Sequence, residues 1–338
     1  MQPGKLWGLR RLADDYGRFA MLALDQRPPV EKLLAERRQR SDVSAADLAA
    51  FKAVLIHNLA PAASAVLVDP VVTYSRLVDD LDPHRGLLVS LDDAAFAADG
   101  LHDRGRVIDD WSVERIKRLG ADGVKFLAWH RPDGNLEAQS HQQRLVEEIG
   151  DQCRHFDIPF VLELLLTPHS DGRLDAPLEH TELVIESVSV FSDPAFGIDL
   201  FQLQLPVLPA DLSGAEVSDQ AIDAFRRLDM AADRPWVQMS TGVGFDVFRQ
   251  ALKLACEAGA SGFLGGRSIW WDAGRQFPNL WRMNTSLRTE GLNRIRELTE
   301  VGNEFAVPWM EKARAIGPPE VDSFGGEAWG ESGLPLSH

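Results

Sequence analysis

The sequence predicts an α/β protein, a single-domain (β/α)₈ (TIM) barrel, from three observations. Eight short apolar runs of strand type occur along the chain, and each is followed by a segment of helix length. The chain has 338 residues, and about 300 of them suit such a barrel with moderate insertions. No G-x-G-x-x-G follows the first run, which disfavours the alternative of a doubly wound open sheet.

The eight strands are expected at residues 19–25, 65–70, 87–92, 123–129, 160–166, 200–206, 236–242 and 262–267. Segments between them, such as 44–60 and 245–260, carry apolar residues three and four apart, which is typical of amphipathic helices. One complete unit is visible at 110–126, where Ser112 is expected to cap a helix, Gly120 to end it, and a strand to follow.

The barrel is expected to span residues 1–316. Residues 317–338 are rich in Gly, Pro, Ser and acidic residues, and we expect them to form a flexible tail on the surface.

The composition excludes several classes of function. The net charge is −16, which disfavours nucleic acid and anionic membranes as partners. No apolar run reaches the length of a membrane span, and the first residues lack the apolar core of a signal peptide. Two cysteines, Cys153 and Cys256, give no disulfide framework and fit a reducing cytoplasm.

Polar residues stand at the C-terminal ends of the predicted strands, where the active site of a (β/α)₈ barrel lies. They are Asp25, Asp69, Asp92, Lys125, Glu163, Gln202, Ser240 and Arg267. Buried charge is costly unless it is paired or used, so their convergence at one barrel mouth favours an active site.

Lys125 has apolar neighbours in the strand sequence GVKFLAW. An apolar pocket would lower its pKa, so that it could act as a base or as an imine-forming nucleophile. The structural alternative is an ion pair inside the barrel, for which Glu163 is the expected partner.

Two glycine-containing segments predict an anion site. MSTGVG (239–244) follows the seventh strand and LGGR (264–267) ends the eighth, the usual phosphate position of this fold. Small residues there, Ser240, Gly242, Gly265 and Gly266, let backbone N–H groups approach an anion, and Arg267 would add a forked cation.

Metal and cofactor sites are not predicted. His130 and His169 follow the fourth and fifth strands and could ligate a metal together with Glu163, but no metal-binding spacing supports this. We expect both to be exposed loop histidines.

Blocks of sequence over about residues 15–310 resemble the class I tagatose-1,6-bisphosphate aldolase family, which includes the sulfofructose-phosphate aldolases. They include FAMLALDQR, DWSVERIKRLGADGVKFLAW, IPFVLELL, GIDLFQLQLPV, WVQMSTGV and AGASGFLGGRSIW. The resemblance implies a barrel that cleaves an anionic ketose by retro-aldol chemistry, and we expect a homo-oligomer.

The resemblance also implies roles for individual residues. Asp25 would act as an acid or base near the substrate hydroxyls, and Lys125 and Glu163 would handle protons. The remaining implied substrate or phosphate contacts are Gln26, Arg27, Gln204, Ser240, Gly242, Gly265, Gly266 and Arg267.

The sixth strand departs from the family pattern. The family's imine-forming lysine lies in a motif of the form D-hydrophobic-hydrophobic-K-V-E-hydrophobic-P, and here that motif reads DLFQLQLP. The resemblance therefore aligns Gln202 with the lysine and Gln204 with the glutamate. An amide cannot form an imine, although Gln202 could donate a hydrogen bond to a carbonyl oxygen.

Three hypotheses follow. In the first, the protein is an aldolase-like carbon–carbon lyase in which Lys125 takes over imine formation. In the second, it is a sugar-phosphate isomerase or epimerase, or a metal-assisted enzyme, in which enolisation needs no imine. In the third, it is a non-catalytic sugar-phosphate sensor.

Overall fold

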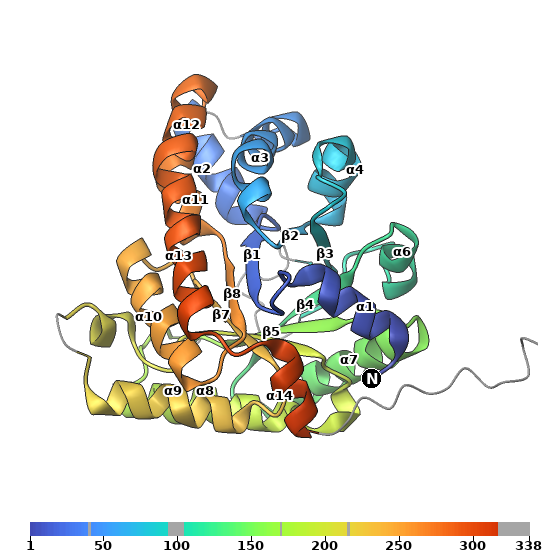
Figure 1. Cartoon of the computed structure of the whole chain (residues 1–338), viewed down its shortest axis with the longest axis vertical. Coiled ribbons are helices and arrows are strands. Elements are labelled where there is room, and N and C mark those ends of the chain that lie inside the picture. Colours follow the sequence, from blue (N-terminus) through green and yellow to red (C-terminus); the bar gives the residue numbers. More distant parts are fainter. Residues whose placement is uncertain (40–41, 94–104, 170, 215–216, 317–338) are drawn as a thin grey trace, which may run out of the picture.

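The computed structural model describes residues 1–39, 42–93, 105–169, 171–214 and 217–316. Within these ranges, eight parallel strands form a closed barrel in which each strand pairs with the next and the last pairs with the first. The predicted (β/α)₈ barrel is confirmed, and Figure 1 shows helices placed around the strands. The expected tail at 317–338 lies outside the described residues.

The strands are β1 (Phe19–Ala23), β2 (Ala65–Val68), β3 (Gly86–Ser90), β4 (Gly123–His130), β5 (Phe160–Leu166), β6 (Leu200–Leu203), β7 (Trp236–Met239) and β8 (Gly262–Gly265). All eight expected strands are present, but several end earlier than predicted. At β2 the reason is visible, because the Asp69 carboxylate accepts a hydrogen bond from the Val72 N–H and starts a helical turn.

The helices are α1 (Pro3–Leu12), α2 (Pro28–Arg38), α3 (Ala45–Leu59), α4 (Ser75–Leu77), α6 (Val113–Arg118), α7 (Leu136–His155), α8 (Pro177–Phe191), α9 (Asp219–Ala231), α10 (Phe245–Ala258), α11 (Arg267–Gly274), α12 (Leu280–Ser286), α13 (Leu292–Phe305) and α14 (Trp309–Ile316). Short helical turns are η1 (Ala60–Ala62), η2 (Pro70–Tyr74), η3 (Val78–Asp80), η5 (Pro194–Phe196), η6 (Pro209–Leu212) and η7 (Leu287–Gly291). The predicted cap of α6 is confirmed, since Ser112 accepts a hydrogen bond from the Arg115 N–H.

Alternate residues of the strands point into the barrel and fill its interior. This barrel core is distinct from the larger core between strands and helices. It contains Phe19, Met21, Ala23, Ala65, Leu67, Leu88, Val161, Leu200, Val237 and Leu264.

The N-terminal end of the barrel is closed by α1, which lies beside β3 and β4 (Figure 1). Leu9 and Leu12 of α1 and Trp309 of α14 pack onto the barrel core. Gly86 begins β3 under α1, and a Cβ there would lie 2.4 Å from the Arg11 carbonyl oxygen, so only glycine allows this approach. The opposite, C-terminal end of the strands is therefore the mouth.

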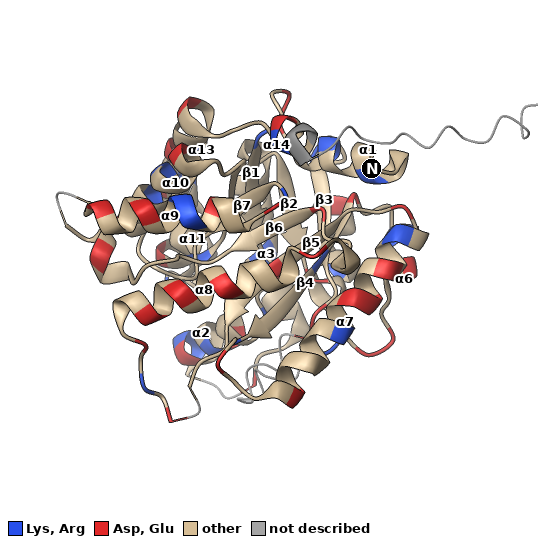
Figure 2. Cartoon of the chain, turned by 90° about the horizontal axis from the view of Figure 1, so that it is seen from below, with Lys and Arg blue, Asp and Glu red and all other residues tan. Residues whose placement is uncertain are grey.

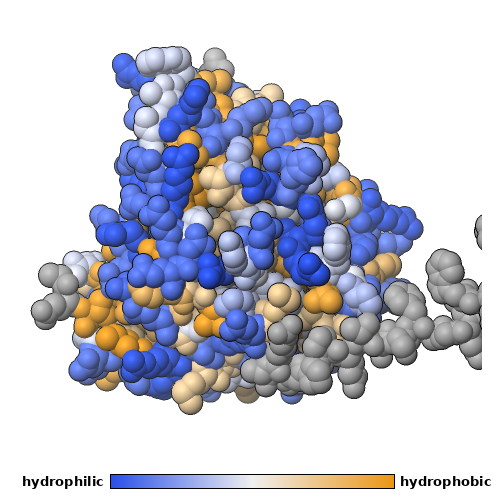
Figure 3. Space-filling view, viewed as in Figure 1, coloured by the Kyte–Doolittle hydropathy of each residue, from blue (hydrophilic) through white to orange (hydrophobic). Residues whose placement is uncertain are grey.

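Positions occupied by Asp, Glu, Lys and Arg lie along outer helices such as α8 and α9 (Figure 2). The face of the molecule shown in Figure 3 is mainly hydrophilic, with small separate apolar areas. In the described part of the chain, the helices are too short or too polar to cross a membrane.

Candidate functional site

Strand geometry places polar residues directly above the barrel core. Asp25, Glu163 and Gln202 each follow a barrel-core residue by two positions, so they share its inward face. Glu163 of β5 and Gln202 of β6 are also register partners. We call Asp25, Asp92, Lys125, Glu163 and Gln202 the mouth cluster.

Lys125 is the centre of the mouth cluster and is buried. Its Nζ contacts three carboxylates: it lies 3.1 Å from Asp25 Oδ2 and 3.0 Å from Asp92 Oδ1, and it forms an ion pair with Glu163 Oε2. Asp25 and Asp92 lie two residues beyond β1 and β3, and Glu163 lies within β5. The expected pair with Glu163 is present, but the surroundings of Lys125 are far more acidic than its own strand suggested.

The charge state of Lys125 follows from these contacts. Burial is the largest influence and acts to lower its pKa, but attraction to Asp92, Glu163 and Asp25 outweighs burial and places the pKa well above its ordinary value. The expectation of a lowered pKa at Lys125 was wrong, because that expectation counted only the neighbours on β4. These contacts favour the ammonium form of the side chain over the free amine.

The pKa of Glu163 is also raised, but here burial itself is the main cause. Burial raises its pKa, the Lys125 ammonium lowers it, and the nearby Asp25 and Asp92 raise it further, with a net rise. Glu163 is thus the carboxyl group of the cluster that is suited to carry and release a proton.

Asp92 has a larger part in the site than the sequence indicated. Its Oδ1 accepts hydrogen bonds from Ser90 Oγ, Lys125 Nζ and the Leu127 N–H. The signal in the sequence was its position at the end of the third strand. In contrast, Asp25 uses Oδ2 for Lys125, and its buried Oδ1 has no partner in the described ranges.

Three of the buried acceptors that lack a partner in the described ranges lie at the mouth. Gln202 Oε1 and Gln26 Oε1, like Asp25 Oδ1, are buried and accept no hydrogen bond from any described residue. Gln204 differs, because its Oε1 accepts from the Leu166 N–H at 3.3 Å and ties the end of β6 to β5. Buried acceptors are costly when left unmet, so the three free oxygens favour a ligand that carries hydroxyl donors.

The predicted anion loops lie next to each other. Thr241 and Gly242 follow β7 with positive φ angles of 45° and 84°, and a Cβ on Gly242 would lie 3.0 Å from Arg267 Cζ. The guanidinium of Arg267 therefore lies against this turn. Ser240, at the start of the turn, is buried.

Gly266 connects the anion loops to the rest of the mouth. A Cβ on Gly266 would lie 3.0 Å from the Ala23 carbonyl oxygen and 3.3 Å from Gln26 Nε2. Gly265 is turned the other way, toward Phe248 and Ile269 in the helix layer, so only its backbone is available to a ligand.

The arginines differ in their partners. Arg267 forms no ion pair or hydrogen bond with any residue in the described ranges. Arg27 lies 3.6 Å from Asp93 through Nη2, and its buried Nε and Nη2 lack a hydrogen-bond acceptor among the described residues. Arg267 is thus the cation of the predicted anion site with no partner in the described chain, which fits an anionic ligand.

Two hydrogen bonds brace the anion loops. Ser268 Oγ donates to the Val243 carbonyl oxygen at 2.5 Å and joins the start of α11 to the turn after β7. Trp270 Nε1 donates to the Ala23 carbonyl oxygen at 3.2 Å and joins α11 to the end of β1. The sequence did not single out Ser268, because nothing local to it distinguishes it from other helix-start serines.

Two other strand-end residues, Asp69 and His130, do not reach the mouth cluster. Asp69 is buried in an ion pair with Lys52 of α3. His130 is buried against Ser187 and Phe191, and burial lowers its pKa to about 4. The expectation of an exposed His130 was therefore wrong.

His169 is half-buried and pairs with Asp175, which Arg131 also holds. Within the described ranges, no group of three His, Cys, Asp or Glu residues is arranged to hold a metal ion.

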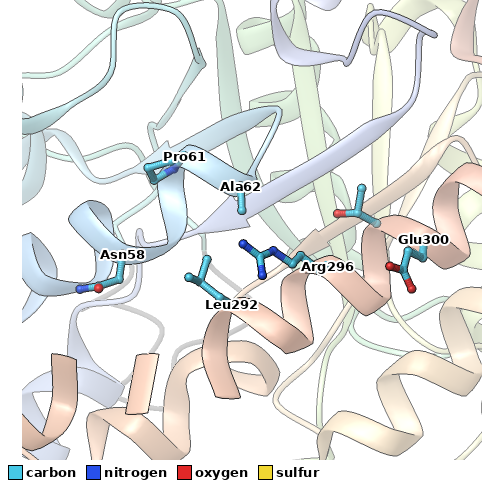
Figure 4. Close-up of a pocket in the computed structure, with 7 residues that line it drawn as sticks. Asn58, Pro61, Ala62, Leu292, Arg296 and Glu300 are labelled. Carbon is cyan, nitrogen blue, oxygen red and sulfur yellow. The ribbon is translucent and has the colours of Figure 1, made fainter. Parts of the chain in front are cut away.

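A separate pocket of about 540 Å³ lies on the flank of the barrel. Figure 4 shows Asn58, Pro61 and Ala62 on one side and α13 residues on the other. None of its lining residues has a buried polar atom without a partner. The pocket thus lacks the features that favour a ligand at the mouth.

The mouth cluster and the predicted anion loops lie at the same end of a (β/α)₈ barrel. Comparison with known proteins is consistent with this, since the model of the DeoC/LacD family aldolase matches residues 19–272. A tagatose 1,6-diphosphate aldolase 1 of Streptococcus mutans is 31% identical over 324 residues, covering 90% of this chain and 97% of its own. The Lactococcus lactis tagatose 1,6-diphosphate aldolase is 32% identical, with 90% and 97% covered. The chain belongs to the DeoC/LacD aldolase family.

Solved structures agree on the fold. A Schiff-base-forming fructose-1,6-bisphosphate aldolase gives a TM-score of 0.57 at 15% identity, covering 87% of this chain and 98% of its own. Fructose-bisphosphate aldolase of Plasmodium falciparum gives 0.61 at 13% identity, covering 89% and 94%.

Proposed function

We propose that the protein is a carbon–carbon lyase of the aldolase type that acts on a phosphorylated ketose. The observation that carries this proposal is the acid–base mouth cluster beside Arg267, a cation that is left without a partner in the described chain. The unmet acceptors at Asp25, Gln26 and Gln202 suit the hydroxyls of a sugar. Relatives named tagatose 1,6-diphosphate aldolase support the same class of substrate.

Each part of the site has a role in this reaction. Asp25, through its free Oδ1, would take the proton from the substrate hydroxyl next to the bond that breaks, and Glu163 would return a proton to carbon. Arg267, with the backbone around Ser240, Gly242 and Gly266, would hold the phosphate. A sulfonate presents the same oxygen geometry to these groups.

The wider setting is also proposed. Cys153 and Cys256 are free and buried, which supports a reducing cytoplasm. We expect residues 1–316 to be the barrel, the remainder to be a tail, and the protein to form a homo-oligomer.

The test is a coupled assay for triose phosphate released from ketose 1-phosphates, ketose 1,6-bisphosphates and their sulfonate analogues. Release of dihydroxyacetone phosphate from at least one of these compounds is expected. Interconversion of the sugars without cleavage would favour an isomerase or epimerase. Tight binding without turnover would favour a sensor. Either of the last two results would overturn the lyase.

Arg267→Ala is expected to raise KM for the phosphorylated ketose about 10-fold to 100-fold, because a charge-assisted contact contributes about 1.5–3 kcal/mol. Arg267→Lys should recover only part of this, since an ammonium lacks the guanidinium fork. Steady-state kinetics with the phosphorylated and unphosphorylated ketose measure the effect. An equal loss with both sugars would contradict a phosphate contact.

Ser268→Ala should raise KM about 3-fold to 10-fold with little change in kcat, since one hydrogen bond of about 1 kcal/mol braces the anion loops. Ser189→Ala is the matched control, because Ser189 on α8 also donates its hydroxyl to a backbone carbonyl but lies far from the mouth in the fold. Unchanged KM in Ser268→Ala would show that the brace has no effect on binding.

A further inference from the structure

The chain contains seven lysines, and all lie in the described ranges. Lys5 pairs with Asp199 and Lys312 with Asp229, both near the closed end of the barrel, and Lys52 pairs with Asp69 outside the mouth cluster. The other lysines outside the mouth lie on outer helices; they are Lys32, Lys117 and Lys253. Lys125 is therefore the only amine that can meet a ligand at the mouth.

The contacts of Lys125 leave no lone pair for attack on a carbonyl. An ammonium group has three N–H donors and no acceptor, and here the three donors face the three carboxylates of Asp25, Asp92 and Glu163. To form an imine, Lys125 would have to lose a proton and leave these carboxylates, which would place uncompensated negative charge in a buried site.

The side chain of Gln202, unlike that of Lys125, has no partner in the described chain. It is buried at the mouth, 4% exposed, and forms no hydrogen bond with any residue that the structure describes. An amide group has an N–H donor and a C=O acceptor side by side. An α-hydroxyketone has the complementary pair, a carbonyl oxygen next to a hydroxyl.

We propose that Gln202 binds the α-hydroxyketone unit of the substrate and that the reaction passes through a non-covalent enediolate, with no imine at any lysine. Gln202 Nε2–H donates to the carbonyl oxygen, and Oε1 accepts from the neighbouring hydroxyl. This inference rests on the proposed function and assigns its mechanism.

The electron flow balances with the groups present. Asp25 takes the proton of the hydroxyl on the far side of the bond that breaks, and that oxygen becomes the aldehyde of the departing fragment. The electron pair of the broken carbon–carbon bond forms the enediolate, whose oxygen charge is stabilised by Gln202 N–H and by the nearby Lys125 ammonium. Glu163, which enters the cleavage step protonated, then delivers this proton to the enediolate carbon and gives dihydroxyacetone phosphate. Asp25 releases its proton to solvent and Glu163 takes one up from solvent, which restores both groups. In the reverse direction, the same groups exchange a C–H proton of dihydroxyacetone phosphate with solvent.

The first experiment uses the full-length protein with dihydroxyacetone phosphate. Borohydride is added to one sample, and intact and peptide masses are read. A second sample is followed by NMR in D₂O. We expect no reduced adduct on any of the seven lysines, together with stereospecific loss of one C–H proton.

An adduct at Lys125 would overturn the non-covalent mechanism and leave the lyase proposal standing. Absence of exchange with cleavage retained would also overturn it. Absence of both exchange and cleavage would overturn the proposed function itself.

Variants of Gln202 give an independent test. Gln202→Leu should slow exchange and cleavage at least about 100-fold, the loss typical for one oxyanion donor. Gln142→Leu is the matched control, because Gln142 is a buried glutamine on α7 with neither side-chain atom bonded to a described residue, and its rates should not change. Rates in Gln202→Leu within 3-fold of wild type would overturn the role of Gln202. If Gln202→Leu does not fold, the same rates are measured in Gln202→Asn, in which the amide is one methylene further from the ligand.

Gln202→Lys adds a readout that a purely structural role would not move. It places an amine beside Glu163, its register partner, without the three-carboxylate arrangement that surrounds Lys125. We expect borohydride to trap dihydroxyacetone phosphate on residue 202 of this variant and not on wild type. Trapping at Lys125 in both proteins would contradict the proposal.

Discussion

Lys125→Met is expected to abolish detectable cleavage and to lower the free energy of unfolding by about 3–5 kcal/mol, the usual result of removing one partner from a buried ion pair. The change keeps an unbranched side chain that is one atom shorter, and it removes the positive charge that contacts three carboxylates. Denaturant unfolding and the coupled cleavage assay measure the two effects. Lys253→Met is the control, because Lys253 on α10 is exposed and its ion pair with Glu257, at 3.8 Å, should be worth about 0–1 kcal/mol.

The stability of Lys125→Met should also depend on pH in a defined direction. Burial, Asp25 and Asp92 all raise the pKa of Glu163, and Lys125 is what opposes them. Without Lys125 the pKa of Glu163 is higher in the native state than in the unfolded state, so the native state binds more protons. The contribution of Glu163 to stability is then fully present below its unfolded pKa and is lost as pH rises through its folded pKa. The deficit relative to wild type should therefore be smaller near pH 5 than near pH 8. If the stability deficit of Lys125→Met stayed constant with pH, the pKa of Glu163 would not depend on Lys125, and the prediction would be wrong.

The barrel could be predicted from the sequence because the alternation of strand-like runs and amphipathic segments repeats along the whole chain. The inward direction of Asp25, Glu163 and Gln202 was predictable for the same reason, since the strand period is two residues and each lies two positions beyond an apolar inward residue. Local periodicity is a property of the sequence alone, and it placed these three residues at the correct end of the barrel.

Contacts between strands could not be predicted in this way. Asp69 and Asp92 each follow a barrel-core residue at an even spacing, yet Asp69 is held by Lys52 and Asp92 by Lys125. The difference depends on which lysine the neighbouring elements bring near, and therefore on tertiary packing. The same cause explains why the pKa of Lys125 was expected in the wrong direction.

The two aspartates that hold Lys125 should respond differently to the same substitution. Asp25 has a free Oδ1 at the mouth, so Asp25→Asn removes the base and should lower kcat about 10²-fold to 10⁴-fold. Its effect on stability should be below about 1 kcal/mol, because the amide oxygen can still accept from Lys125.

Asp92→Asn should show the reverse pattern. All three hydrogen bonds to Asp92 Oδ1 come from the protein itself: Ser90, Lys125 and the Leu127 N–H. Weakening the charged contacts of Asp92 in this buried position should cost about 1.5–3 kcal/mol of stability. The loss of kcat should be at least about 10-fold smaller than in Asp25→Asn, because proton transfer does not use Asp92. Unfolding curves and single-turnover rates for the pair decide the assignment. If Asp92→Asn proved the slower enzyme and Asp25→Asn the less stable protein, the base would be Asp92, and the role proposed for Asp25 would be wrong.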